Sequence, residues 1–552
     1  MHYKLPGAVI PVLFIITCTI SFLSCVEERL DISIIPKPQS IELKKGWFVI
    51  NSQTRILYNK GDMETANYLQ KQLKTDVDIS LEVKELNNPK GTDNCIWILK
   101  APELKNQLGE EGYYLQIDKS GIKISAATST GIFYGIQSLR QLLPINKKEK
   151  TENQLTIPCL SIKDKPRFSW RAFMLDEARH YKGMEVVKNL LDQMALHKMN
   201  VFHWHLTDDQ GWRIEIKKYP NLTEIGSKRA DTQIGGWDSD QYSGQPHEGF
   251  YTQDQIREIV QYATERHIII LPEIEMPGHT SAAIASYPWL GVTGNKIEVS
   301  IRFGKHYDIF NVADPKVEEF LRDVLFEVME LFPSKFIHIG GDEVKYDQWK
   351  SSEQIQKFMK KVGLKTPADL QIYFTNKMSA FIESQGRRMM GWNDILGGHV
   401  LHAYHSDADT KVSQDLAQNV IIHFWKGDLK LAEEAILRGY DIVNSYHVFT
   451  YLDYTYKDIP LDKAYDFDPI PEGMDSTLHS KVLGMSCQMW GEWIPTVESM
   501  EHQVYPRLSA FSEVSWTKKS SKDFINFTRR LEVMQERWDI LGISYARILT
   551  IN

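Results

Sequence analysis

Between residues 172 and 180 the chain reads Ala172-Phe173-Met174-Leu175-Asp176-Glu177-Ala178-Arg179-His180. Four apolar residues run directly into a group of charged ones, a pattern typical of a buried strand that ends in a functional loop. An open doubly wound sheet normally has a glycine-rich phosphate-binding turn after its first strand. This strand is followed by no such glycine, which favours a closed barrel over an open sheet.

Strand-like and helix-like segments continue to alternate after this stretch. Helix starts are marked by Thr252 with Gln255, a capping box, and by Asp314 before Pro315, an N-cap followed by proline. Eight strands over about 350 residues predict an α/β fold of the (β/α)8 TIM-barrel type with long loops. The segment 446–477, after the seventh strand, has no clear helical pattern. The expected strands are Ala172–Leu175, Val201–Leu206, Ile268–Ile274, Phe336–Ile339, Arg388–Gly391, Val420–Phe424, Asp441–Ser445 and Val482–Ser486.

The region before the barrel has a mixed pattern, which predicts a small α+β domain over residues 26–165. Tyr113–Ile117 and Ile122–Ala126 flank a polar turn that ends in Gly121, a hairpin signal, and Thr130–Leu143 is amphipathic. No group of reactive side chains stands out there. We therefore expect catalysis in residues 166–552, which also include a C-terminal helix that packs on the barrel through an apolar stripe.

Composition excludes several classes of protein. The chain has 552 residues, 42% of them apolar and 25% charged, as in folded soluble proteins. Lys and Arg total 64 against 72 Asp and Glu, so the net charge of −8 gives no overall basic surface for nucleic acid. Five cysteines in such a long chain exclude a disulfide scaffold.

The N-terminus, residues 1–25, has the pattern of a secretory signal peptide. Lys4 precedes an uncharged apolar stretch that runs from Leu5 to Leu23, and Ser24-Cys25 follows it. A cysteine after an apolar run and a small residue resembles a bacterial lipoprotein cleavage box, in which Cys25 would carry the lipid. We expect export as a lipoprotein of the periplasm or outer-membrane surface. An ordinary signal peptide and an uncleaved anchor are the alternatives.

The chemistry lies where the expected strands end, since barrel enzymes place catalytic groups at that rim. These positions hold many carboxylates, four tryptophans and one arginine. Aromatic rings cover the apolar C–H faces of sugars, while carboxylates and arginine bind the hydroxyls, so the set predicts a carbohydrate site. Its members are Asp176, Arg179, His180, Asp208, Asp209, Trp212, Glu275, His279, Asp342, Glu343, Trp392, Trp425, Tyr451, Asp453, Trp490 and Glu492.

Cleavage of a glycosidic bond needs an acid for the leaving oxygen and a group that stabilises or traps the anomeric centre. Asp342 and Glu343 are neighbours in sequence, so their side chains diverge and do not flank a bond as acid and opposing nucleophile. We assign the acid role to Glu343. Asp342 would then orient a 2-acetamido group of the substrate, whose carbonyl oxygen attacks the anomeric carbon, as in substrate-assisted glycosidases.

Four stretches resemble family 20 glycoside hydrolases, the β-N-acetylhexosaminidases, and Trp490-Gly491-Glu492 completes the set. This resemblance covers about residues 167 to 516 and implies a TIM barrel after a smaller α/β domain. It also implies exo-acting, retaining removal of terminal GlcNAc or GalNAc through an oxazolinium intermediate, without metal or cofactor. The four stretches are Asp176–Tyr181 (DEARHY), Asn200–Asp209 (NVFHWHLTDD), Pro272–His279 (PEIEMPGH) and His338–Val344 (HIGGDEV).

The resemblance also implies roles for the catalytic residues and for those around the acetamido group. Glu343 matches the general acid/base and Asp342 the residue that positions the acetamido group. Tyr451 matches the tyrosine that hydrogen-bonds the acetamido carbonyl. The walls of the pocket match Trp392, Trp425 and Trp490.

Other matching residues hold the terminal sugar or support the acid. Arg179 matches the arginine that grips the 3- and 4-hydroxyls, and Glu492 and Asp453 match residues that bind the 4- and 6-hydroxyls. Asp208 and His279 match a supporting relay behind the acid. The pocket implied by these residues closes over one sugar at the non-reducing end.

Three alternatives remain at this point. His203 and His205 form a His-x-His pair that barrel amidohydrolases use for metal, although hydrogen-bonded histidines of the barrel interior fit the apolar strand better. A surface lipoprotein could bind glycans without cleaving them. A disaccharide-releasing relative, similar to lacto-N-biosidases, is the third. The sequence does not decide between GlcNAc and GalNAc, nor does it give the oligomeric state.

Overall fold

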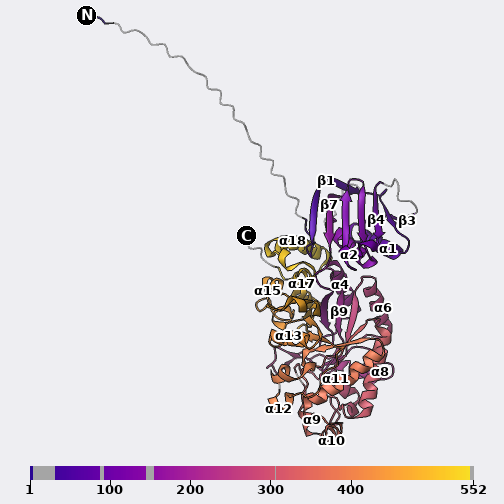
Figure 1. The fold of residues 1–552 in the computed structure, drawn as a ribbon, viewed down its shortest axis with the longest axis vertical. Coiled ribbons are helices and arrows are strands. Elements are labelled where there is room, and N and C mark those ends of the chain that lie inside the picture. Colours follow the sequence, from indigo (N-terminus) through magenta and orange to yellow (C-terminus); the bar gives the residue numbers. More distant parts are fainter. Residues whose placement is uncertain (4–31, 87–92, 145–153, 305, 404, 548–552) are drawn as a thin grey trace. The chain divides into compact units, whose positions relative to one another are not determined.

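The structure, a computed structural model, describes residues 1–3, 32–86, 93–144, 154–304, 306–403 and 405–547. The expected apolar stretch and Cys25 lie outside these described residues. Residues 33–552 form one compact unit, which contains an N-terminal sheet domain and a barrel (Figure 1). Across the described part of the chain, no helix combines the length and the apolar character that crossing a membrane requires.

The N-terminal domain is built on a seven-stranded mixed sheet. The predicted hairpin is present, with Asp118 opposite Gly121 at its turn. Glycine is needed there because a Cβ on Gly121 would lie 2.3 Å from the Trp97 ring. Helix α3 packs on β5 and β6 and also contacts α1. The strand order is β1 (Ser40–Ile50), β7 (Leu155–Asp164), β5 (Tyr113–Asp118), β6 (Gly121–Ala126), β4 (Cys95–Lys100), β2 (Arg55–Tyr58) and β3 (Glu82–Glu85), and the helices are α1 (Met63–Val77), α2 (Lys105–Leu108) and α3 (Ser129–Leu142).

The second domain is a closed barrel of eight parallel strands, which confirms the predicted fold class. All eight expected segments form its strands, with ends that differ by at most three residues from those expected. The order around the barrel is β8 (Trp170–Asp176), β9 (Val201–His205), β16 (Ile269–Glu273), β17 (Phe336–His338), β18 (Arg388–Trp392), β19 (Ile421–Phe424), β20 (Asp441–Asn444) and β21 (Val482–Met489).

The barrel interior is layered because alternate residues of each strand point inward. One layer is apolar and contains Val201, Leu271, Met390 and Ile421. A second, polar layer lies two residues further along the same strands, closer to their C-terminal ends. That second layer contains His203, Glu273, Trp392 and His423, all buried.

Most helices lie between the strands, as the alternation predicts. The capping box of Thr252 and Gln255 forms at the start of α6, and Asp314 caps α8 with Pro315 as its first residue. The segment without a clear pattern holds the short helices α14 and α15. Helices of this domain are α4 (Met184–Leu196), α5 (Asn221–Glu224), α6 (Gln253–Thr264), α7 (Ser281–Ser286), α8 (Pro315–Leu331), α9 (Asp347–Ser351), α10 (Glu353–Val362), α11 (Pro367–Ser384), α12 (Asp407–Thr410), α13 (Leu429–Leu437), α14 (His447–Thr450), α15 (Leu461–Asp466), α16 (Val497–Val504), α17 (Arg507–Trp516) and α18 (Phe524–Leu541).

Short two-residue strands and 3-10 turns complete the loops. In the described part of the chain, all six two-residue strands lie in the long connection after β9, which the periodicity of the sequence does not reveal. They are β10 (Thr207–Asp208), β11 (Gly211–Trp212), β12 (Lys228–Arg229), β13 (Gln233–Ile234), β14 (Gln241–Tyr242) and β15 (His247–Glu248).

The C-terminal helix α18 packs on the barrel, as expected, and it also contacts the N-terminal domain (Figure 1). Its Trp538 indole donates to Gln193 of α4, and Arg537 donates to the carbonyl of Leu143 beside α3. The two domains also meet through buried charges, because the Lys198 ammonium lies 3.1 Å from the Asp164 carboxylate with both side chains fully buried. This junction lies at the N-terminal ends of the barrel strands. The expected site lies at the opposite, C-terminal rim, which is formed by the loops.

Candidate active site

The loop after β17 carries the two central carboxylates, and two glycines allow its path. Gly340 and Gly341 have φ of +64° and +89°, in the left-handed region that favours glycine. A Cβ on Gly340 would lie 1.8 Å from the Glu275 carboxylate, so no side chain fits there. Glu343 itself has φ of +52°, a conformation that costs a non-glycine residue free energy and that is found preferentially at functional sites.

Asp342 is buried, Glu343 is partly buried, and other charged side chains lie close to both. His279 Nε2 lies 3.8 Å from Asp342 and 3.9 Å from Glu343. Burial raises the pKa of Asp342 to about 8, with the charges of Asp394 and Glu343 adding to the shift and His279 opposing it. The Oδ1 atom of Asp342 is buried and has no hydrogen-bond partner among the described residues. Such an atom is available to accept a hydrogen bond from a ligand.

A relay of charged groups lies behind these carboxylates. His279 Nδ1 lies 3.2 Å from both Asp208 and Asp209, and Asp208 also contacts Arg179 at 2.9 Å. Burial would raise the pKa of Asp208, but Arg179 and His279 outweigh it and hold that pKa well below its ordinary value. Asp209 also accepts from the backbone N–H of Ser281, so it caps the start of α7. The expected support of the acid by Asp208 and His279 is therefore geometrically possible.

Arg179 is held at the rim by several acceptors. Asp176 accepts both its backbone N–H and a guanidinium N–H at 3.1 Å, so Asp176 anchors the loop that carries Arg179. Gln210 accepts from Arg179 Nε at 3.0 Å, and Glu492 lies 3.8 Å from Nη2. The guanidinium also lies over the Trp490 ring, 5.2 Å from its centroid. Arg179 is thus pre-oriented for hydroxyl groups.

Aromatic side chains from four strand ends form a box. The rings of Trp425 and Tyr451 are stacked at 6.1 Å with an angle of 9°, and Tyr451 lies 6.1 Å from Trp490. Trp392 lies 5.9 Å from Trp490 and is buried. Burial raises the pKa of the Tyr451 hydroxyl well above its ordinary value, which keeps the proton that it can donate. The structure brings together all four aromatic residues that the resemblance named.

Asp453 and Glu492 lie at the Arg179 side of the box. Burial raises the pKa of Asp453 well above its ordinary value, and the charge of Glu492 adds to this shift. Burial also raises the pKa of Glu492, which Arg179 partly offsets. In the described part of the chain, Asp453 Oδ1 has no hydrogen-bond partner. Two partly buried carboxyl groups at this end provide polar atoms for hydroxyls of a ligand.

Sequence reasoning missed Asp394, which joins the acid to the box. Its Oδ1 accepts from the Glu343 backbone N–H at 3.3 Å and its Oδ2 from the Trp425 indole at 2.9 Å. Burial raises the pKa of Asp394 to about 6. Asp394 comes two residues after Trp392, at a strand end, and this position could have indicated it. Gln210, the partner of Arg179, gave no comparable signal.

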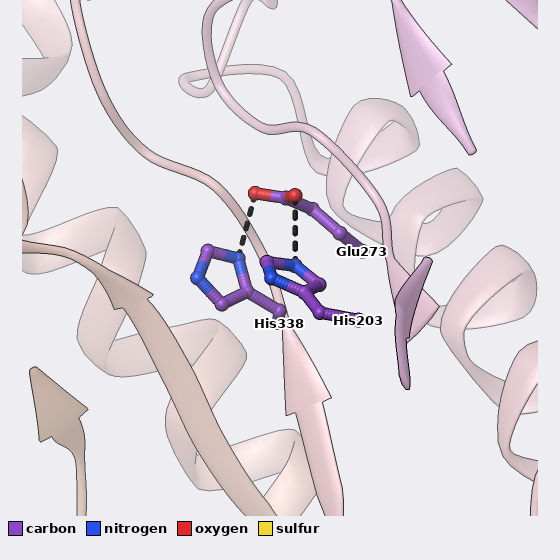
Figure 2. A group of neighbouring side chains, drawn as sticks. All are labelled: His203, Glu273 and His338. Atoms are coloured by element: carbon purple, nitrogen blue, oxygen red, sulfur yellow. Dashed lines mark ion pairs between the residues drawn. The ribbon is translucent and has the colours of Figure 1, made fainter. Parts of the chain in front are cut away.

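Several groups of side chains have the composition of a metal site. His203, Glu273 and His338 have ligand atoms within 4.8 Å of one another inside the barrel (Figure 2). However, both Glu273 oxygens already accept N–H groups, one from Trp392 at 2.8 Å and one from His205 at 2.6 Å. His205 hydrogen-bonds Glu273 and Asp208, as expected for a histidine of the barrel interior. His203 Nε2 lies 2.9 Å from Glu273, but among the described residues neither ring nitrogen of His203 has a hydrogen-bond partner. We predict activity that a chelator such as EDTA does not change.

An acidic pair beside an aromatic box, at the C-terminal rim of a (β/α)8 barrel, defines the class of glycoside hydrolases. The family model described as glycosyl hydrolase family 20, catalytic domain, matches residues 168–519, and the model for domain 2 of the same family matches residues 31–165. The chain therefore belongs to glycosyl hydrolase family 20.

Individual relatives agree with this assignment. The chain is 37% identical to a beta-hexosaminidase from Porphyromonas gingivalis, over 96% of this chain and 67% of that protein. A solved exo beta-N-acetylglucosaminidase from Vibrio harveyi, in complex with N-acetylglucosamine, is similar with a TM-score of 0.79 and 31% identity, over 94% of this chain and 78% of that one. A beta-N-acetylhexosaminidase from Bacteroides fragilis has a TM-score of 0.76 and 29% identity, over 94% and 97%.

Proposed function

We propose that this enzyme is an exo-acting β-N-acetylhexosaminidase, which removes terminal non-reducing GlcNAc or GalNAc from glycans. The observation that carries the proposal is the geometry of Asp342, Glu343 and Asp394: two carboxylates lie side by side next to the aromatic box, and Asp394 connects them to it. This arrangement supports one carboxylate as the acid and the other as the group that orients the acetamido. The names of its relatives support the same activity.

In the proposed first step, Glu343 gives its proton to the glycosidic oxygen while the acetamido carbonyl oxygen of the substrate attacks the anomeric carbon. The aglycone leaves as an alcohol and an oxazolinium ion forms. Asp342 accepts the amide N–H and stabilises the positive charge that develops on it, while Tyr451 donates to the acetamido oxygen. The amide N–H and this charge favour ionised Asp342, which offsets the raised pKa of the free enzyme.

In the second step, the Glu343 carboxylate takes a proton from water as that water attacks the anomeric carbon. The five-membered ring opens, the acetamido group is restored, and the product keeps the β configuration. Trp392, Trp425 and Trp490 enclose the acetamido methyl and the sugar face. Because displacement occurs twice at one carbon, configuration is retained without a covalent enzyme intermediate.

The distal end of the pocket favours exo-action. Arg179 would bind the 3- and 4-hydroxyls of the terminal sugar, and Asp453 and Glu492 the 4- and 6-hydroxyls. Arg179 is buried, Asp453 and Glu492 are partly buried, and the three side chains interact through their charges. The relay of Asp208 and His279 supports the acid from the other side. A second sugar beyond the 4-hydroxyl would meet the side chains of Arg179, Asp453 and Glu492.

The test compares two aryl glycosides that differ at one carbon. We expect release of the aryl group from the N-acetyl-β-glucosaminide, little release from the β-glucoside with a plain hydroxyl at carbon two, and inhibition by a thiazoline analogue of the intermediate. Equal rates on both glycosides would reject the acetamido nucleophile. Binding without release would indicate a glycan-binding module instead. Analysis of products from defined GlcNAc- and GalNAc-terminated oligosaccharides separates single-sugar release from disaccharide release.

Export as a bacterial lipoprotein, with a lipid on Cys25, is part of the proposal. It rests on the sequence of residues 1–25, followed by a domain over 26–165 and the catalytic domain over 166–552. Palmitate labelling of the wild-type protein, lost in Cys25→Ser, is the expected result. Equal labelling of both proteins, or none of either, would contradict it.

A further inference from the structure

We propose that Glu273 is a positioning residue for hydrolysis, which holds the Trp392 wall of the acetamido pocket through one carboxylate oxygen and the relay behind Glu343 through the other. This inference rests on the proposed function and deepens it. It assigns a role to a buried carboxylate that does not touch the sugar in the mechanism above.

Glu273 lies at the centre of the polar layer of the barrel. It is the last residue of β16 and is fully buried. His203 Nε2 lies 2.9 Å from one carboxylate oxygen and His338 Nδ1 lies 2.8 Å from the other, so imidazoles of β9 and β17 enclose it (Figure 2). Burial would raise the pKa of Glu273, but the neighbouring histidines outweigh it and hold that pKa well below its ordinary value.

The two oxygens receive N–H donors that belong to different parts of the active site. The Trp392 indole N–H donates to Oε1 at 2.8 Å, and His205 Nδ1 donates to Oε2 at 2.6 Å. An indole N–H can only donate, and an ionised carboxylate can only accept, so the first contact has one polarity. A buried donor that loses its acceptor is left unsatisfied, which disfavours the arrangement that buries it. The orientation of Trp392 is therefore tied to the charge of Glu273.

From His205 the contacts continue to the catalytic acid as a chain of alternating charge. His205 Nε2 lies 3.0 Å from Asp208, which lies 3.2 Å from His279 Nδ1, and His279 Nε2 lies 3.9 Å from Glu343. Burial would lower the pKa of His205, but Glu273 and Asp208 raise it to about 10. A protonated His205 donates to both of these carboxylates at once.

A glutamine at position 273 has the shape of glutamate but only one acceptor oxygen. If its NH₂ group faces the indole N–H of Trp392, two donors oppose each other and the pocket wall loses its acceptor. If the NH₂ group faces His205 Nδ1 instead, that nitrogen must accept, so His205 becomes neutral and the relay loses the positive charge beside Asp208. Misplacement of reacting groups by about 1 Å can cost 10²-fold in rate, so we expect kcat of Glu273→Gln to fall about 10- to 100-fold.

Glu513→Gln is the matched control. Glu513 is a fully buried carboxylate 2.7 Å from Arg530, in the contact between α17 and α18 and outside the site. Glu513→Gln makes the same chemical change as Glu273→Gln and is expected to lower the thermal stability of the protein. It should leave kcat, KM and the pH profile within twofold of the wild type.

Four readouts separate positioning from a purely structural effect. They are kcat and KM on two aryl N-acetyl-β-glucosaminides, one with a good and one with a poor leaving group, the ratio of the two kcat values, the affinity for the thiazoline inhibitor, and the pH profile of kcat. In Glu273→Gln we expect kcat to fall more on the substrate with the poor leaving group than on the other. We also expect weaker binding of the inhibitor and a shift of the basic limb of the pH profile of kcat. Wild-type values of all four would overturn the proposal, whatever the stability of the variant.

Two further variants test each branch if Glu273→Gln does not fold. Trp392→Phe removes the indole donor and should weaken inhibitor binding with little change in the leaving-group ratio. His205→Gln should change that ratio with little effect on inhibitor binding. The opposite pattern, or no effect of His205→Gln on the ratio, would refute the inference. Wild-type enzyme that is inactive on both substrates would reject the proposed function as well, whereas active wild type with unaffected variants rejects the inference alone.

Discussion

The two domains solve the problem of a buried sheet in different ways. In the N-terminal domain the central strands carry Ile96, Ile98, Ile122 and Ile124, all fully buried and apolar. In the barrel the layer nearest the C-terminal rim carries histidine, glutamate and tryptophan at equally buried positions. Ionisable groups are costly to bury unless they are paired, so their concentration in one layer marks the place where the molecule has retained chemistry.

The contrast also predicts which changes affect rate and which affect stability. Substitutions of residues in the polar layer of the barrel should alter turnover, because these residues position the reacting groups or the side chains that support them. Substitutions in the sheet domain, or at its junction with the barrel, should alter the free energy of unfolding and leave kcat unchanged. The first two predictions below pair a change in the barrel with a matched change in the sheet domain.

Glu343→Gln should have the largest effect. It removes the proton that the leaving oxygen needs, and general acid catalysis typically contributes about 10²–10⁴-fold. We expect kcat to fall by at least that factor on substrates with poor leaving groups. The control is Glu82→Gln on the exposed strand β3, which should change kcat less than about twofold. Near-normal turnover of purified Glu343→Gln would refute its assignment as the acid.

Asp342→Asn should come next, with a fall in kcat of about 10²–10³-fold on acetamido substrates, as for loss of one group that stabilises developing charge. The variant keeps the shape but cannot balance the positive charge on the amide. Asp118→Asn, at the hairpin turn of the sheet domain, is the matched control. Kinetics on an aryl N-acetyl-β-glucosaminide check both variants, and equal kcat values would show that Asp342 does not take part.

Asp164→Ala tests the junction between the domains. It leaves the Lys198 ammonium buried without its partner, which costs about 3–5 kcal/mol of stability. Unfolding in denaturant should show this loss, while kcat of the folded variant stays at the wild-type value. The double variant with Lys198→Met should recover much of the stability, since replacing both charges removes the unpaired one. A fall in kcat in proportion to the loss of stability would contradict the prediction that the junction affects stability and not turnover.

Part of the fold and of the site could be predicted from the sequence. The barrel strands could be predicted because apolar segments such as Val201–His205 are long and their spacing is regular. The convergence of Arg179, Asp342 and Glu492 followed from one rule, that parallel strands end at one rim. The helices α14 and α15 were not visible, because segments of four to six residues are too short to show a helical period.

The remaining contacts depend on register and side-chain direction, which no single segment contains. Glu273 and His205 lie on neighbouring strands, and only the pairing of Glu273 with His205 in β16 and β9 brings them together. Asp394 required the position of a turn after β18. Contact of α18 with the N-terminal domain required the placement of both domains. The sequence therefore indicated the reacting residues more readily than it indicated the supporting residues that hold them in position.

Among the active-site variants, Asp394→Asn should have the smallest effect on rate and the most specific one on pH dependence. Asparagine can still accept from the Trp425 indole, so we expect kcat to fall about 10-fold, the order of one charge-assisted hydrogen bond. The negative charge of Asp394 is one of the causes that raise the pKa of Asp342. Its removal lowers that pKa, so the limb of the kcat/KM profile that reports ionisation of Asp342 should move to lower pH. A limb that stays in place, or moves to higher pH, would show that Asp394 supports the box without acting on the charge of Asp342.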